Sequence, residues 1–127
     1  MKHILSLLFA LALSVAVMAQ KQIKLEEVSQ HIGDSVTVSG KVFSGRYFAN
    51  SDGAPTLLNM GAAYPNQLLT VVVRGAARKE MAGAPEKDLL NKDITVSGKV
   101  ELYKDKPQLV VYSSNQLAEA AKTTPAQ

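Results

Sequence analysis

The chain contains no cysteine and no tryptophan, and it has only two histidines, His3 and His31. The absence of thiols excludes disulfides, thiolate metal sites, cysteine catalysis and lipid attachment through an N-terminal cysteine. A catalytic triad needs a histidine as its base, and His31 is the one histidine beyond the first residues. His31 stands near the end of a predicted helix, where the helix dipole favours a histidine, so we interpret it as structural rather than as a base or metal ligand.

A large excess of charge of one sign is also lacking. The chain has 14 Lys and Arg against 11 Asp and Glu, which gives a net charge of +3. A strongly basic domain would by itself indicate nucleic acid as a partner, and this near balance does not. Any electrostatic attraction to a ligand must therefore come from a local patch.

Acidic clusters and phosphate-binding motifs are missing as well. The acidic residues fall mostly in predicted turns, where Asp52 and Asp105 are typical turn formers. The sequence contains no calcium loop, no P-loop and no dinucleotide fingerprint. Arg46, Arg74 and Arg78 are not accompanied by the carboxylate cluster that a metal-dependent nuclease needs. We expect a protein that is not an enzyme and that uses no cofactor and no metal.

The first nineteen residues have the layout of a secretory signal. Lys2 gives a basic start, residues 4–18 form an apolar run, and Ala19 ends a small-residue exit. The run is shorter than the about 20 residues that a membrane helix needs, so a retained anchor helix is the less favoured alternative. We expect an exported chain, periplasmic or secreted, with no membrane span after cleavage. The expected organisation is a signal peptide (1–19), one domain (20–122) and a loose C-terminal tail (123–127).

Hydrophobic periodicity predicts a short helix followed by strands. Leu25, Val28 and Ile32 recur at helical spacing, so a helix is expected over residues 22–32, ended by Gly33. Beyond it the period changes to two, which is typical of half-buried strands. Five strands are expected, over residues 35–42, 56–60, 67–74, 93–103 and 107–112.

The connections carry turn signals or helix-forming composition. A long hairpin loop is expected over residues 42–55, and the continuous apolar run of strand 67–74 should be covered on both faces. Pro85 can open a short helical turn that carries Leu89 and Leu90 inward. The remaining connections are a helical insert over 75–91, turns over 61–66 and 104–106, and a closing helix over 116–122 capped by Asn115.

One heptapeptide occurs twice. Residues 36–42 read V-T-V-S-G-K-V and residues 94–100 read I-T-V-S-G-K-V, so the two copies differ only in their first residue. Two copies are too few for a solenoid. They indicate two equivalent corner strands of one barrel, in which Gly40 and Gly98 lie on the inward side and let each strand bend sharply.

The order of the elements predicts the fold class. Three strands, a helical insert and two further strands are the order of the OB (oligonucleotide/oligosaccharide-binding) fold, a five-stranded Greek-key barrel, which makes the protein all-β with small helices. The middle of the chain reads L-L-N-M-G-A-A-Y-P-N-Q-L-L-T-V-V-V and its end reads I-T-V-S-G-K-V-E-L-Y-K-D-K-P-Q-L-V-V. With the first repeat, these segments make residues 23–117 resemble bacterial exported OB-fold domains related to the tRNA-anticodon-binding and nuclease-associated OB families. The resemblance implies a fold of the nucleic-acid-binding type and no particular ligand, since OB domains also bind sugars, peptides and proteins.

The fold class predicts where a ligand would bind. An OB barrel uses the face of its second and third strands, between the loop joining strands one and two and the loop joining strands four and five. Aromatic rings interleaved with cations suit a single nucleic-acid strand, because rings stack on bases and cations attract phosphates. The candidate residues are Arg46, Tyr47 and Phe48 in the first loop, Tyr103, Lys104 and Lys106 in the second, and Asn59 and Arg74 on the strands between.

Most of these candidates have a structural alternative. Phe48 fits the core as well as the ligand site, and the two candidate tyrosines can simply cap a barrel end. The lysines of turn 104–106 can form a solvated turn that protects a sheet edge. Residues 64–67 are interpreted as a rigid turn next to the third strand and kept in reserve as a site segment.

The leading hypothesis is an exported, non-catalytic domain that binds single-stranded DNA or RNA with low sequence specificity. The alternative is an envelope binding or scaffold module for a protein, peptide or glycan, which the small net charge and the export signal favour. A third hypothesis is an accessory domain of an extracellular nuclease system that acts in trans. The oligomeric state is left open by the sequence.

Overall fold

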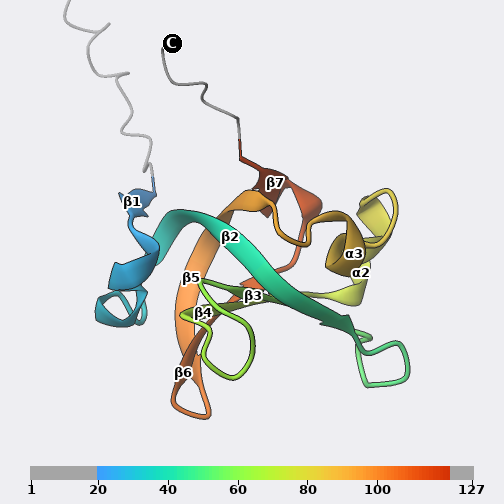
Figure 1. The fold of residues 1–127 in the computed structure, drawn as a ribbon, viewed down its shortest axis with the longest axis horizontal. Coiled ribbons are helices and arrows are strands. Elements are labelled where there is room, and N and C mark those ends of the chain that lie inside the picture. The colour runs from blue at the N-terminus through green and yellow to red at the C-terminus, as the bar shows by residue number, and fades with distance from the viewer. Residues whose placement is uncertain (1–19, 121–127) are drawn as a thin grey trace, which may run out of the picture.

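Alternating apolar residues turn five strands of the chain into a closed barrel (Figure 1). The computed structural model describes residues 20–120. The expected signal peptide (1–19), the expected tail (123–127) and the last two residues of the expected domain therefore lie outside the described residues. The strands are β1 (Lys21–Ile23), β2 (Ser35–Tyr47), β3 (Thr56–Met60), β4 (Leu69–Val73), β5 (Asp93–Tyr103), β6 (Lys106–Val111) and β7 (Leu117–Glu119); the helices are η1 (Leu25–Gln30), α2 (Gly75–Glu80), α3 (Pro85–Asp88) and η2 (Ser114–Gln116).

The strand order is that of the OB fold, which confirms the predicted class. The barrel strands run β2-β3-β4-β6-β5, and a β2–β5 pairing closes the ring. β4 and β6 are parallel, whereas the other pairs of the ring are antiparallel. The helical insert between β4 and β5 is present as α2 and α3. No helix among residues 20–120 is long and apolar enough to cross a membrane.

The two copies of the repeated heptapeptide lie side by side. β2 and β5 pair antiparallel with Val38 of the first copy opposite the equivalent Val96 of the second. The hydroxyls of Thr37 and Ser97 lie 2.8 Å apart on the outer face of this pair. The two copies are therefore adjacent paired strands, related by a local two-fold axis, in addition to being equivalent corner strands of the barrel.

Both repeat glycines face the core, as predicted. A Cβ atom on Gly40 would lie 2.8 Å from Leu25 Cδ2, and one on Gly98 would lie 2.8 Å from Leu109 Cδ2. The glycines thus leave space that leucine side chains from other elements fill. This is the close approach that a strongly bent barrel strand requires.

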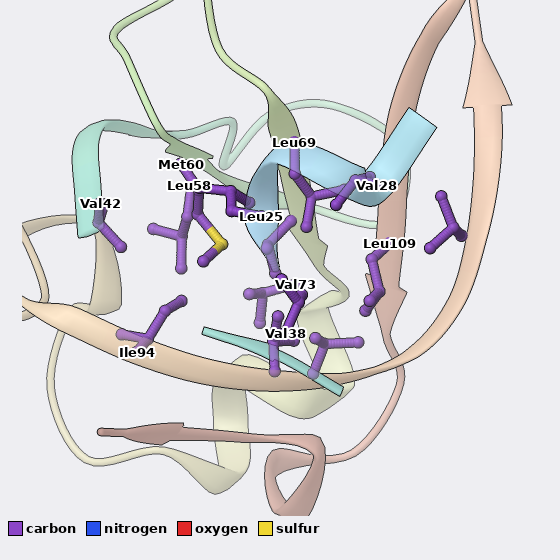
Figure 2. Packing of buried hydrophobic residues seen from close by; sticks show 14 of the residues in the cluster. Leu25, Val28, Val38, Val42, Leu58, Met60, Leu69, Val73, Ile94 and Leu109 are labelled. Atoms are coloured by element: carbon purple, nitrogen blue, oxygen red, sulfur yellow. The ribbon is translucent and has the colours of Figure 1, made fainter. Parts of the chain in front are cut away.

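The core lies inside the barrel and is closed from two sides. Figure 2 shows Leu25 and Val28 of η1 pointing toward the other core side chains, and Ala77 of α2 is fully buried as well. Burial of one leucine or isoleucine side chain contributes roughly 2 kcal/mol, so these residues hold the barrel without a disulfide. The largest fully buried side chains are Leu58, Met60, Leu69, Ile94 and Leu109.

The predicted terminal helices are wrong in length or type. The chain before η1 forms β1, which pairs in parallel with β2, and η1 ends at Gln30, which leaves Ile32 38% exposed instead of on the buried face. At the other end, the predicted helix over 116–122 is replaced, within the described residues, by η2 and β7. The Gln116 side chain accepts the N–H groups of Tyr112 and Ser113, which pins η2, and β7 then pairs with β5. Asn115 is therefore not a helix cap.

Two further expectations need correction. Strand β4 is covered on one face only, because Thr70 and Val72 are half-buried on its outer face. In the insert, Pro85 opens α3 and Leu89 packs against the core as predicted, but Leu90 is 41% exposed. α3 ends at Asp88, which is too early to orient two successive leucines inward.

Candidate functional site

A β-bulge at Phe43 decides which side chains of β2 face outward. Val42 pairs with Met60 but Ser44 pairs with Asn59, so one residue of β2 is left over. A bulge of this kind exchanges the inward and outward positions of the strand beyond it. Even-numbered residues face the core before the bulge and the outer surface after it.

β2 extends to Tyr47, five residues beyond its predicted end. Arg46 and Tyr47 were expected in a loop, but they pair with Leu57 and Thr56 of β3. Consecutive strand residues point to opposite faces. Arg46 therefore faces the outer surface together with Ser44, whereas Tyr47 faces the other way.

The outer surface of β2, β3 and β4 forms the floor of a groove of about 960 Å³. Its walls are the loop over residues 48–55, the turn between β3 and β4, and the β5–β6 hairpin. This turn and hairpin lie at the same end of the barrel (Figure 1), and Lys106 Nζ donates a hydrogen bond of 2.8 Å to the carbonyl oxygen of Pro65 between them. At the other end, the N–H of Gly75 donates to the carbonyl oxygen of Gly53, which fixes the loop beside Arg74.

Cross-strand pairing arranges the floor in two rows. One row is polar: Ser44 pairs with Asn59, Asn59 with Thr70, and Thr70 with Gln108 of β6. The next row is apolar, with Arg46 opposite Leu57 and Leu57 opposite Val72. The groove thus has a polar end, near the β5–β6 hairpin, and an apolar end that carries an arginine.

Hydrogen bonds connect Ser44, Asn59 and Thr70 of the polar row and extend to Gln67. Asn59 Nδ2 donates to Ser44 Oγ over 3.0 Å, Thr70 Oγ1 donates to Asn59 Oδ1 over 3.1 Å, and Gln67 Nε2 donates to Thr70 Oγ1 over 2.9 Å. Asn59, predicted as an outward residue, is only 7% exposed at the bottom of the groove. The network holds these amides and hydroxyls in fixed orientations.

The groove concentrates the positive charge of the domain. Residues 20–120 contain 12 Lys and Arg (14 less Lys2 and Lys122) against 11 Asp and Glu, a net charge of +1. The lining includes one acid, Asp52. It also includes four cations, so the groove carries +3 and the rest of this region carries −2 (+1 less +3). The four lining cations are Arg46, Arg74, Lys104 and Lys106.

Three aromatic residues line the same groove. Tyr64 is 72% exposed and Tyr103 is 58% exposed, with Lys104 Nζ 5.3 Å from the centroid of the Tyr103 ring. Phe48 is half-buried in the groove and is not part of the core, and the Arg46 guanidinium lies 4.9 Å from its ring centroid. Tyr64 belongs to the segment that the sequence suggested only as a reserve.

Seven of the eight predicted site residues line the groove, and Tyr47 does not. Its ring lies 3.5 Å from the guanidinium carbon of Arg78, on the side of the barrel covered by α2 and α3. Arg78 Nη1 also donates to Glu86 Oε1 over 2.6 Å and to Thr56 Oγ1 over 2.8 Å. Tyr47 thus covers a structural ion pair, as expected for a tyrosine that closes a barrel end.

Sequence reasoning found Asn59 but missed the other residues of the polar floor. Ser44, Thr70 and Gln108 carried no motif, because their common row depends on the bulge and on strand register. Tyr64 had a usable signal, because it is an aromatic residue in the predicted turn that joins the second and third strands. The chain offers no comparable signal for Ser44.

The Arg78–Glu86 ion pair makes the stability of the fold pH-dependent. The hydrogen bond from Arg78 lowers the pKa of Glu86 and the same bond raises the pKa of Arg78. A lowered carboxyl pKa stabilises the folded state above the ordinary value of about 4.3, and this stabilisation is lost as the pH falls through the folded value. The side chains of Arg78 and Glu86 are 16% and 12% exposed, so solvent screens the pair only weakly.

We expect the urea midpoint to fall between pH 6 and pH 3, and to fall less in a Glu86→Gln variant. The neutral amide cannot lose the ion pair on acidification, so it removes this part of the pH dependence. Equilibrium unfolding followed by circular dichroism measures the midpoints. Glu26→Gln, at an exposed position away from the pair, is the control. A Glu86→Gln profile as steep as that of the parent protein would contradict the assignment.

The remaining candidates from the sequence are the acidic residues and His31. Among residues 20–120, no three His, Asp or Glu side chains lie close enough together to hold a metal ion. His31 Nδ1 lies 3.1 Å from Asp34 Oδ2 near the end of η1, outside the groove. The pair joins the end of η1 to the turn before β2.

Comparisons with known proteins concern the fold. No family model and no curated protein matches the chain. A solved structure described as an aspartyl-tRNA synthetase from Leishmania major Friedlin is similar with a TM-score of 0.51 and 11% identity, over 90% of this chain and 23% of that one. This chain thus spans less than a quarter of the synthetase's length.

Two further solved structures are similar at lower scores. Telomere capping protein Ten1 from Saccharomyces pombe has a TM-score of 0.45 and 10% identity, over 84% of this chain and 86% of that one. Replication protein A from U. maydis bound to ssDNA has a TM-score of 0.40 and 18% identity, over 84% and 77%. Scores below 0.5 carry no argument about this chain. The likeness to the synthetase structure, at 11% identity, shows the fold alone, which the strand order identifies as an OB barrel.

Proposed function

We propose that this protein is an exported, non-catalytic domain that binds single-stranded nucleic acid in the groove over β2, β3 and β4. The observation that carries the proposal is the composition of the groove. Two exposed tyrosines, Tyr64 and Tyr103, line the groove together with its polar floor, and four cations line the same groove. Aromatic faces and cations in one groove are what a strand of unpaired bases requires.

The same composition favours a single strand over a duplex and over a neutral ligand. Exposed rings stack on bases only where the bases are not paired with one another. A net charge of +3 in the groove, against +1 for residues 20–120, attracts a chain of phosphates more than a neutral peptide or glycan. Stacking and phosphate contacts are tolerant of sequence, so low overall specificity is part of the proposal.

We expect the purified protein to bind labelled single-stranded DNA or RNA with an affinity that falls steeply with salt. Four cations on a single strand correspond to a slope of about −2.8 in a plot of log affinity against log salt concentration, so the affinity should fall about 50-fold between 50 and 200 mM salt. Fluorescence anisotropy titrations at several salt concentrations measure the slope. The same sequence as a duplex should bind more weakly.

A failure of this experiment would turn the search to the alternative ligands. Absence of binding at 50 mM salt would refute the nucleic-acid proposal. The groove would then be tested with peptides and glycans, which also stack on exposed tyrosines, in keeping with an envelope binding module. Export through residues 1–19 belongs to the same proposal, and cell fractionation of the tagged chain tests it.

A further inference from the structure

The hydrogen bonds on the groove floor run in one direction. Gln67 donates to Thr70, Thr70 to Asn59, and Asn59 to Ser44, and the backbone N–H of Tyr64 donates to Ser44 Oγ as well, over 3.4 Å. Thr70, Asn59 and Ser44 therefore each accept a hydrogen bond from the residue before it in this series. The series ends at the hydroxyl of Ser44.

The Ser44 hydroxyl has a hydrogen left and no free lone pair. A serine hydroxyl has two lone pairs and one hydrogen. Both lone pairs accept, one from Asn59 Nδ2 and one from the Tyr64 N–H. Among residues 20–120, no protein acceptor is hydrogen-bonded to the Ser44 hydroxyl. Ser44 is half-buried and lines the groove, so its hydrogen can reach a bound ligand.

The neighbouring groups place a base, rather than a phosphate, at this hydroxyl. The backbone N–H of Tyr64 donates to Ser44, so the Tyr64 side chain starts beside this hydroxyl. Tyr64 is 72% exposed. The floor residues hydrogen-bond to one another and, within the described residues, to no cation. Lys106 Nζ donates one of its three hydrogens to the Pro65 carbonyl oxygen and keeps two for a phosphate at the wall of the groove. A base that stacks on Tyr64 would turn its edge toward the polar floor.

We propose that the polar end of the groove selects a pyrimidine with a keto oxygen at C4, thymine or uracil, over cytosine, which has an amino group at C4, and that Ser44 determines this preference through its hydroxyl. The inference rests on the proposed function and deepens it from strand binding to the reading of one base. A keto oxygen accepts the Ser44 hydrogen. An amino group at the same place is a donor that meets another donor, because the lone pairs of the Ser44 hydroxyl are occupied. The hydroxyl hydrogen and the amino hydrogen that faces it are then both left without an acceptor.

The test compares two pyrimidine oligomers, because thymine and cytosine differ in this edge and stack to similar extents. We expect the parent protein to bind dT12 about 10-fold more tightly than dC12 at pH 8, which equals about 1.4 kcal/mol. dU12 should bind like dT12, since the methyl group is not part of the argument. Anisotropy titrations at one salt concentration give the three affinities.

Variants assign the preference to the hydroxyl. Ser44→Ala should lower the dT12 to dC12 ratio to less than 3-fold, and Ser44→Thr, which keeps the hydroxyl, should restore it. Ser29→Ala, at an exposed position of η1 outside the groove, should leave the ratio unchanged. Thermal unfolding of each variant verifies the fold, and the Ser44→Thr protein provides the test if Ser44→Ala does not fold.

The possible outcomes separate this inference from the proposed function. Equal binding of dT12 and dC12 by the parent protein, or a ratio that Ser44→Ala leaves unchanged, overturns the base preference while strand binding stands. If the parent protein binds none of the oligomers at 50 mM salt, the proposed function fails and the base preference fails with it.

Discussion

Replacement of Arg78 by alanine is expected to lower the free energy of unfolding by about 3 kcal/mol, the low end of the range for breaking a buried ion pair from one side. Arg78 joins three elements: it donates to Glu86 of α3 and to Thr56 of β3, and it stacks on Tyr47 of β2. Its removal leaves the Glu86 carboxylate, 12% exposed, without its partner and opens the space under the tyrosine ring.

The measurement is urea denaturation followed by circular dichroism at pH 7. Lys79→Ala, which removes an exposed cation from the same helix, is the matched control and should change the free energy by less than about 0.5 kcal/mol. In a double-mutant cycle, Glu86→Gln should cost much less in the Arg78→Ala background than in the parent protein. A loss of less than about 1 kcal/mol for Arg78→Ala would show that the ion pair is not what holds α2 and α3 to the barrel.

The second large effect is expected on ligand binding. Reversal of both groove arginines, Arg46→Glu with Arg74→Glu, should weaken single-strand binding on the order of 100-fold at 50 mM salt, because two attractions become repulsions. Both side chains line the groove, at its apolar end and beside the loop over residues 48–55. The slope of log affinity against log salt concentration should also become shallower, by about 1.4 for the two lost contacts.

The control must separate a local contact from a change in net charge. Lys79→Glu with Lys99→Glu changes the net charge by the same amount, at two exposed positions outside the groove. It should weaken binding only a few-fold, since screening at this salt concentration limits distant charges. Equal losses for the two double variants would mean that the protein attracts nucleic acid by its overall charge and that the groove is not the interface.

Much of the architecture follows from local pattern. The period of two in Val36, Val38 and Val42, and again in Ile94 and Val96, predicts which strand residues are buried, and all five are. The helical insert and the inward glycines were likewise readable, since each depends on residues near one another in the chain. The strand count then leaves the OB order as the natural solution.

The two ends of the domain differ from the predicted helices, because helical periodicity in one segment carries no information about the strands beside it. Residues 21–23 pair with β2, and residues 117–119 pair with β5. Backbone pairing with an existing sheet edge satisfies more hydrogen bonds than a short isolated helix would. A pattern confined to one segment does not reveal that an edge is available.

The sequence by itself determined the barrel class, the absence of thiol chemistry and the two ends of the groove at which cations and rings gather. Only the tertiary structure decided which of those side chains face the groove. The bulge at Phe43 exchanges the faces of β2, so that Ser44 and Arg46 enter the groove while Tyr47 turns to Arg78. The physical reason is that a bulge is a property of the pairing between two strands: the extra residue exists only relative to β3, and a single strand read alone has no position at which to place it.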